Sequence, residues 1–373
     1  MDNALTPLPL PLESLPAAIQ RFCNPQGPAQ ARLMAAKGLV PVKGNDQVTL
    51  LSQLAHDADE PVRNAALDSI LKLPEGVMSA ACDAPLLPPV LHFLGRTLKN
   101  EDQLGRIVAN PASHDATVED VARGCSERIA ERIAVNEQRL LRAPAIIEAL
   151  YKNRNTRMST ADRLIELAAR NGVVVEGIPH FAAAVEAVQG QLIPEPSDEA
   201  LPQDAVFAQS LLEDNDENAF QEDKAAGTEE VKQQYKPLSM QISDMTKSEK
   251  LRLALVGNMA ARALLVRDHN RQVAMAAVQS PQMTVAEAAA IARSKEVSED
   301  ILRFIGNKKE WIKSGEIKHN LCFNSKTPIG ISMRFISHLR TEELRQLAKN
   351  RNVPAQLKSL ATQWVMRKEK KEG

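Results

Sequence analysis

The chain has 373 residues, of which 44% are hydrophobic and only 3% aromatic, and its formal net charge is −1. So few aromatic side chains exclude a core built on large cross-strand pairs, and they favour closely packed helices of Leu, Ala, Ile and Val. The apolar stretches fall short of the ~18 residues that cross a bilayer, and residues 1–16 lack the basic and apolar regions of a signal peptide. The composition therefore predicts a soluble, cytoplasmic, all-α protein without a transmembrane segment.

The net charge conceals three regions of different balance. Residues 1–194 carry 22 acids and 19 bases, residues 195–230 carry 12 acids and one base, and residues 248–373 carry 12 acids and 23 bases. This asymmetry indicates a strongly acidic segment followed by a basic domain.

The N-terminal half predicts a proline-rich tail over residues 1–16 and a helical domain over residues 17–192. Prolines there stand between apolar runs, where they start or end helices. In the run that follows Pro61, for example, Val62, Ala66, Ile70 and Leu73 share one helical face.

Residues 193–247 predict a disordered, acidic, flexible linker. The segment is rich in Asp, Glu, Gln and Pro and poor in large apolar side chains, so it cannot bury enough surface to offset the entropy of ordering. One island, residues 205–220, has apolar side chains at Val206, Phe207 and Leu211. A transient helix or a short docking motif is the alternative for this island.

Residues 248–367 predict a second, basic helical-repeat domain, and residues 368–373 predict a charged tail. Turns of a few residues separate the apolar runs of this domain. Ser298 and Thr341 each precede acidic residues, so both positions favour the start of a helix.

Each half of the chain contains an echo at a spacing of 43 residues. Asn110 recurs as Asn153 in the first half, and Thr284 recurs as Thr327 in the second. A period of 40–47 residues is typical of stacked helical hairpins of the HEAT or armadillo kind. The echo therefore predicts an α-solenoid with a period of about 43 residues.

Residues 56–74 resemble a HEAT repeat, whose second helix opens with an acidic turn, a proline, Val-Arg and a small residue three positions on. Here these residues are Asp57, Pro61, Val62, Arg63 and Ala66. The proline fixes the entry of the helix and the acid lies at its positive end. The resemblance implies an α-solenoid with a binding role, and it implies that Arg63 pairs with an acid of a neighbouring unit.

The sequence lacks the motifs of nucleotide-binding, zinc-protease and serine-hydrolase sites. The four cysteines lie far apart and the seven histidines are scattered, so neither set has the spacing of metal ligands. We therefore predict no cofactor, no metal site and no catalytic residue, and hence a protein that is not an enzyme. A HEAT-like enzyme acting on DNA bases or on a pigment is the enzymatic alternative.

A basic face on the C-terminal domain is the candidate binding site, because cations on successive helices can follow a phosphate backbone or an acidic protein. The candidate residues are Arg262, Arg267, Arg271, Lys308, Lys309, Trp311, Lys313, Arg334 and Arg345. Two alternatives are a solvated face whose arginine stems cover apolar surface, and a face that the chain's own acidic linker occupies.

The predicted function is that of a non-enzymatic cytoplasmic adaptor or scaffold, which binds partner proteins through the surfaces of its helical repeats. The alternative is a nucleic-acid-binding protein that uses the basic C-terminal domain. The sequence identifies no particular partner.

Overall fold

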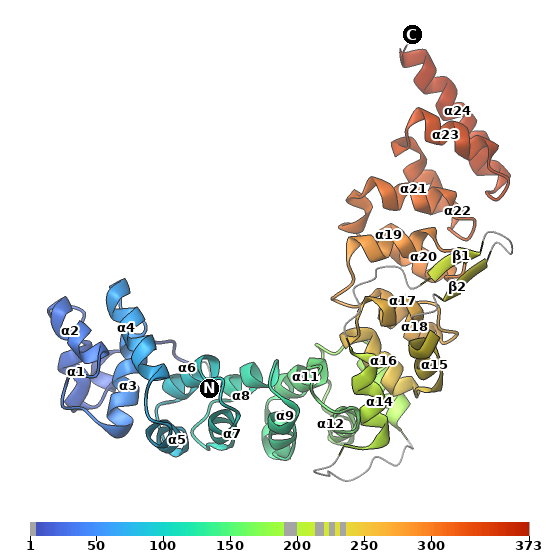
Figure 1. Cartoon of the computed structure of the whole chain (residues 1–373). Helices are drawn as coiled ribbons and strands as arrows, with labels where there is room; N and C mark the ends of the chain where they lie inside the picture. The colour runs from blue at the N-terminus through green and yellow to red at the C-terminus, as the bar shows by residue number, and fades with distance from the viewer. Residues whose placement is uncertain (1–4, 190–199, 213–219, 224–227, 232–235, 373) are drawn as a thin grey trace. The chain divides into compact units, whose positions relative to one another are not determined.

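The structure is a computed structural model, and it describes residues 5–189, 200–212, 220–223, 228–231 and 236–372 (Figure 1). The chain divides into two compact units, unit 1 (Met1–Gly177) and unit 2 (Ile178–Gly373). The predicted all-α class is confirmed, with one short hairpin as an exception that the sequence did not predict. Within the described ranges, none of the helices combines the length and the apolarity of a membrane span.

Unit 1 is built from two layers of short helices. Its helices are α1 (Ala17–Cys23), α2 (Ala29–Ala36), α3 (Gly44–Leu54), α4 (Glu60–Leu71), α5 (Glu75–Asp83), α6 (Pro88–Thr97), α7 (Glu101–Ala109), α8 (Asp115–Ala122), α9 (Glu127–Ala134), α10 (Glu137–Arg142), α11 (Pro144–Lys152) and α12 (Met158–Arg170), after the 3-10 helix η1 (Leu12–Ser14). Helices α1, α3, α5, α7 and α9 pack in sequence on one another and form one layer. In the other layer α2 packs on α4, α6 on α8, and α8 on α11.

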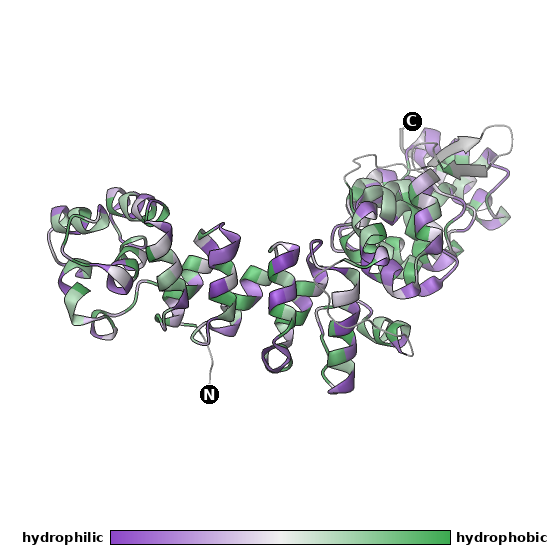
Figure 2. Cartoon of the chain, turned by 60° about the horizontal axis from the view of Figure 1, so that its bottom comes forward, coloured by the Kyte–Doolittle hydropathy of each residue, from purple (hydrophilic) through white to green (hydrophobic). Residues whose placement is uncertain are grey.

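Several helices of unit 1 are amphipathic, with hydrophobic and hydrophilic residues on different sides (Figure 2). In α9, Ile129 and Ile133 are buried, whereas Glu127 and Arg128 are exposed. Burial of one face of each helix against both neighbours therefore produces the layers.

Successive helices of one layer start 23 to 31 residues apart, most often 26, so the predicted period of about 43 residues is wrong. Helix α5 starts at Glu75, α7 at Glu101 and α9 at Glu127. A step of 43 residues leads from a helix of one layer to a helix of the other. Thr284, for example, caps α19, whereas Thr327, 43 residues on, precedes α22, a helix of the other layer.

The echoed asparagines mark a turn that ties the ends of neighbouring helices together. Nδ2 of Asn110 donates hydrogen bonds to the carbonyl oxygens of Cys82 and Ala84, at 2.7 and 2.8 Å, where α5 ends. Asn153 does the same at the end of α8, and Asn324 at the end of α19 (Val285–Arg293). Because the last carbonyls of a helix have no partner within it, each asparagine satisfies groups that would otherwise be orphaned.

Unit 2 has the same two-layer construction. Its elements are α13 (Phe181–Val188), α14 (Pro202–Ser210), β1 (Phe220–Asp223), β2 (Thr228–Val231), α15 (Lys236–Asp244), α16 (Lys247–Val256), α17 (Met259–Leu265), α18 (Arg271–Val278), α19, α20 (Glu299–Asn307), η3 (Trp311–Lys313), α21 (Gly315–Phe323), α22 (Ile329–Phe335), η4 (Ile336–His338), α23 (Thr341–Lys349) and α24 (Ala355–Glu372). Helices α15, α17, α19, α21 and α23 form one layer. In the other layer α16 packs on α18, α18 on α20, and α22 on α24.

The described parts of the predicted linker, residues 193–247, are elements of unit 2. Helix α14 packs on α15 and α16, because Phe207 is buried with its ring 4.8 Å from the guanidinium carbon of Arg252. Nδ2 of Asn258 also donates a hydrogen bond to the carbonyl of Leu212. The apolar island therefore forms a packed helix, and β1 and β2 pair as an antiparallel hairpin with Phe220 opposite Val231. The rest of the predicted linker lies outside the described residues.

Both predicted tails also differ from the structure. Leu10 and Leu15 are buried in the core of unit 1. Gln53 holds the backbone of Leu10 through its amide, which accepts from the N–H at 2.9 Å and donates to the carbonyl at 2.7 Å. At the other end, α24 extends to Glu372 and includes most of residues 368–373.

The HEAT-like motif lies where it was expected, at the start of α4, with Val62 and Ala66 buried. The pairing implied for Arg63 is wrong, because its guanidinium donates to the carbonyls of Asp57 and Ala58. Arg32 of α2 makes the pair between helices instead, with its Nε 2.7 Å from Asp57 Oδ2.

We expect Asn324→Ala to lower the free energy of unfolding by ~1–3 kcal/mol, because it leaves the buried carbonyls of Ala292 and Ser294 without a donor. Asn352→Ala is the matched control, since Asn352 is exposed, and it should cost less than ~0.5 kcal/mol. Urea unfolding of the full chain measures both, and equal losses would show that the asparagine turn does not tie the helices together.

Candidate functional site

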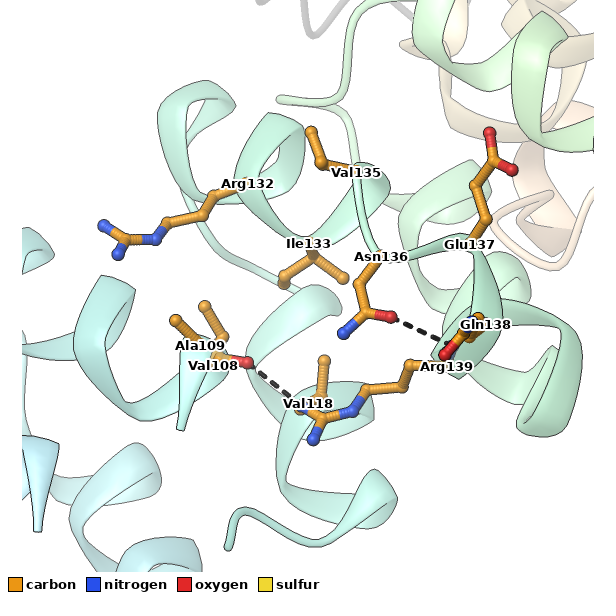
Figure 3. A pocket seen from close by; sticks show the side chains of 10 residues that line it. All are labelled: Val108, Ala109, Val118, Arg132, Ile133, Val135, Asn136, Glu137, Gln138 and Arg139. Carbon is orange, nitrogen blue, oxygen red and sulfur yellow. Dashed lines mark hydrogen bonds between the residues drawn. The ribbon is translucent and has the colours of Figure 1, made fainter. Parts of the chain in front are cut away.

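An open groove with a volume of about 510 Å³ lies in unit 1 between the end of α7 and helices α8, α9 and α10 (Figure 3). Its floor is apolar and consists of the buried side chains of Val108, Val118 and Ile133. Val135 and Asn136 stand exposed on its rim. The groove thus combines an apolar floor with a largely polar border.

The inserted helix α10 forms one wall of the groove. Residues between α9 and α11 fold into this extra helix, so α12 starts 31 residues after α9. Asn136 caps α10, because its Oδ1 accepts a hydrogen bond from the N–H of Arg139 at 3.1 Å (Figure 3). The groove therefore arises where an extra helix stands between helices of the two layers. No residue of the groove was predicted from the sequence, and the signal that would have found it is the long connection between α9 and α11.

Arg139 holds the base of the groove in place. Its guanidinium donates to the carbonyls of Val108 and Ser113, at 3.0 and 3.3 Å, and its Nε lies 3.5 Å from Asp115. A hydrogen bond from Arg142 is the main cause that keeps the pKa of Asp115 below its usual range. The buried charge of Arg139 is thus satisfied by the protein itself, so this residue shapes the groove rather than waiting for a ligand.

Arg132 and Glu137 provide free charges at the rim. The side chain of Arg132 extends from α9 (Figure 3). Its guanidinium reaches Gly105 of α7, because a Cβ placed on this glycine would lie 3.1 Å from Nη1 of Arg132. Among the contacts of the described residues, neither Arg132 nor Glu137 has a hydrogen-bond or ion-pair partner for its side chain. The groove therefore offers a cation, an anion and amide groups around an apolar floor.

A second pocket, of about 390 Å³, lies beneath the N-terminal segment and is lined by His56, His92, Phe93 and Arg96 among others. Nδ1 of His92 lies 3.3 Å from the hydroxyl of Thr117, and its Nε2 lies 3.6 Å from Asp120. A Thr–His–Asp set can activate a hydroxyl only where a substrate reaches it. Thr117 is only 1% exposed, so this set is a structural network.

His92 makes the stability of unit 1 depend on pH. Burial lowers the pKa of His92 below 6.5, and the attraction of Asp120 only partly opposes this. The unfolded chain therefore takes up the proton at a higher pH than the folded chain. The stability that neutral His92 contributes is complete above about pH 6.5 and is lost as the pH falls through the lowered pKa.

We expect His92→Gln to reduce the fall in unfolding free energy between about pH 7 and pH 5, measured by urea unfolding at a series of pH values. His56→Gln is the control, because it changes an exposed histidine of the same pocket. Its unfolding free energy should fall with pH as steeply as that of the wild type. If the unfolding free energy of both variants falls as steeply as that of the wild type, burial of neutral His92 does not cause the pH dependence.

The nine residues predicted as a basic face do not form one surface. Arg262 is 3% exposed, with its Nη2 2.8 Å from Glu287 and its Nη1 2.7 Å from the carbonyl of Gly257. Trp311 is 2% exposed and packs edge-on against Phe304. Their prediction as binding residues is wrong, because helical spacing alone does not show which arginine or tryptophan points inward.

Most of the other predicted residues are engaged within the protein. The engaged residues and their contacts are Arg267 with the carbonyl of Ala263, Arg271 with Asp300, Lys308 over the ring of Trp311, Arg334 with the carbonyl of Gly306, and Arg345 with Glu342 and Glu369. Lys309 and Lys313 are exposed in the connection after α20. The alternative that the acidic linker covers this face concerns residues 195–230, most of which lie outside the described part of the chain.

The structure gathers a different set of cations on unit 2. Five exposed basic residues lie where α19, α21 and α23 end, and we call them the basic edge: Arg293, Lys295, Lys326, Lys349 and Arg351. None of these five residues is among the nine predicted as a binding face. The signal that would have found Lys326 is its place two residues after Asn324 in an asparagine turn.

The titratable groups of the described residues show no metal-binding cluster, since no three His, Cys, Asp or Glu side chains come together there. All four cysteines are free and buried. Burial raises the pKa of the Cys23, Cys125 and Cys322 thiols to about 12. These thiols are protonated at neutral pH and hence are unreactive.

No protein-family model matches this chain, and no curated protein matches it. Its function therefore has to be argued from its own surfaces.

We expect Arg262→Met to cost ~3–5 kcal/mol of unfolding free energy, because it leaves Glu287 buried without a cation. The double variant with Glu287→Gln should recover part of this loss. Arg271→Met breaks an exposed pair with Asp300 and should cost only ~0–1 kcal/mol. Denaturant unfolding of the three variants checks this, and equal costs for the two single variants would contradict the burial of Arg262.

Proposed function

We propose that the protein is a non-enzymatic adaptor or scaffold, whose helical units form HEAT-like α-solenoids that bind partner proteins. The observation that carries the proposal is the open groove beside α10, with its apolar floor and charged rim. An apolar centre within a polar border is the usual composition of a protein-binding surface.

The chemistry of the groove supports a peptide as its occupant. Val108, Val118 and Ile133 offer a floor for an apolar side chain. Asn136 keeps its side-chain amide N–H groups for a partner, since the hydrogen bond that it makes uses only Oδ1. The buried guanidinium of Arg139 is already satisfied, so the groove lacks an unsatisfied reactive group at its base.

The arrangement of the helices supports the solenoid part of the proposal. Helices of one layer repeat every 23 to 31 residues, and each contacts mainly its neighbours. Stacked repeats of this kind present long ridged faces, which suit extended contacts with other proteins. A place in the cytoplasm belongs to the same proposal, and the four free, buried thiols agree with a reducing compartment.

Affinity capture with the tagged full chain tests the proposal. Val135 is 70% exposed on the rim, so Val135→Glu should leave the fold intact and weaken the binding of an apolar partner by about tenfold or more. Val174→Glu is the matched control, because Val174 is 69% exposed in the same unit and does not line the groove.

A defined set of proteins should be captured by the wild type and by Val174→Glu after nuclease treatment, and lost with Val135→Glu. Capture of the same set by both variants would remove the groove from the proposal. Loss of the whole set on nuclease treatment would favour the nucleic-acid alternative.

A further inference from the structure

The basic edge lies along one border of unit 2, where the helices of one layer end. Asn324 shows that the ends of α19 and α21 are neighbours, because its amide donates to the carbonyls of Ala292 and Ser294 at 2.9 and 2.7 Å. Helix α23 packs on α21 and ends in a similar turn, in which the N–H of Asn352 donates to Asn350 Oδ1. The three turns therefore follow one another along the border (Figure 1).

The cations of the basic edge are available for a partner. All five side chains are exposed, and in the part of the chain that the structure describes none of them has a hydrogen-bond or ion-pair partner. The acids that begin α20 on the same border are already paired, Glu299 with Arg303 and Asp300 with Arg271. Glu296 is the acid that lies among the basic residues, so the border keeps an excess of positive charge.

The position of these residues at helix C-termini explains why cations are tolerated there, since they face the negative end of the helix dipole. The dipole does not explain why these cations lack partners.

Two exposed apolar side chains follow Lys326 in the chain. They are Ile329 and Met333 of α22, which are 36% and 47% exposed. Exposed apolar side chains beside unpaired cations are typical of a surface that binds protein.

The spacing of the turns favours a peptide over a polynucleotide. Neighbouring packed helices lie ~8–10 Å apart. An extended peptide advances ~3.3 Å per residue, so acids at every third position repeat every ~10 Å. A DNA duplex places a phosphate every ~3.4 Å along each strand, so cations at the turns would leave most phosphates unmatched. No tryptophan or tyrosine lies on the basic edge to stack on a base.

We propose that the basic edge binds an extended acidic segment of a partner protein, with acids about three residues apart and an apolar residue that contacts Ile329 and Met333. This surface lies in unit 2 and the groove in unit 1, so each proposal can fail without the other.

Fluorescence anisotropy of a labelled synthetic peptide with the full chain tests the inference at low ionic strength. The probe has about 12 residues, with glutamate at every third position and a central leucine. The edge variant carries Arg293→Gln, Lys326→Gln and Arg351→Gln. The matched control carries Lys308→Gln, Lys309→Gln and Lys313→Gln, and it loses the same charge from the opposite border of the same unit.

The edge variant should bind the probe about tenfold more weakly than the wild type, and the control should stay within about twofold. Circular dichroism confirms that both variants are folded, and the single change Lys326→Glu at an exposed turn gives a second measure. Equal losses in both triple variants would overturn the inference. So would an equal affinity for a peptide of the same composition with adjacent glutamates, or tighter, edge-dependent binding of a DNA duplex of similar charge.

Discussion

The contact on which this structure depends is the double hydrogen bond from an asparagine amide to the last carbonyls of a neighbouring helix. Asn110, Asn153 and Asn324 all make it, in both units of the chain. The helices are short, most with about nine residues, so propensity alone does not hold them. The asparagine turn fixes the ends of neighbouring helices side by side, and the apolar faces of the helices then pack in register.

Both candidate surfaces follow from this construction. The groove appears where α10 is inserted into the α9–α11 connection. The basic edge appears because α19, α21 and α23 pack on one another in one layer, and Asn324 ties the turn that carries Lys326 to the end of α19. The cations that stabilise the fold are not those of the basic edge. They are Arg32, Arg139 and Arg262, which are buried and have partners within the protein.

The sequence predicts the class of the fold because helical spacing, prolines and capping residues are local signals. It does not predict the repeat length, because Asn110 and Asn153 share a turn but belong to different layers. It also fails at Arg262 and Trp311, whose burial depends on which side of a helix faces the neighbouring layer. In residues 202–210, composition suggested disorder, yet α14 packs on α16 with Phe207 buried against Arg252.

The central claim is that a two-helix unit of about 26 residues organises the chain, and duplication of such a unit tests it most directly. Residues 101–126 comprise α7, α8 and the turn to α9. The account predicts that a chain with these residues duplicated in tandem stays monomeric, gains helical circular dichroism in proportion and unfolds cooperatively in urea. Duplication of residues 110–152, one 43-residue echo, adds the four helices α8, α9, α10 and α11. It begins and ends with a helix of the same layer, so it exchanges the layers and should disrupt unit 1. Normal folding of the 43-residue duplication together with disruption by the 26-residue one would contradict the account.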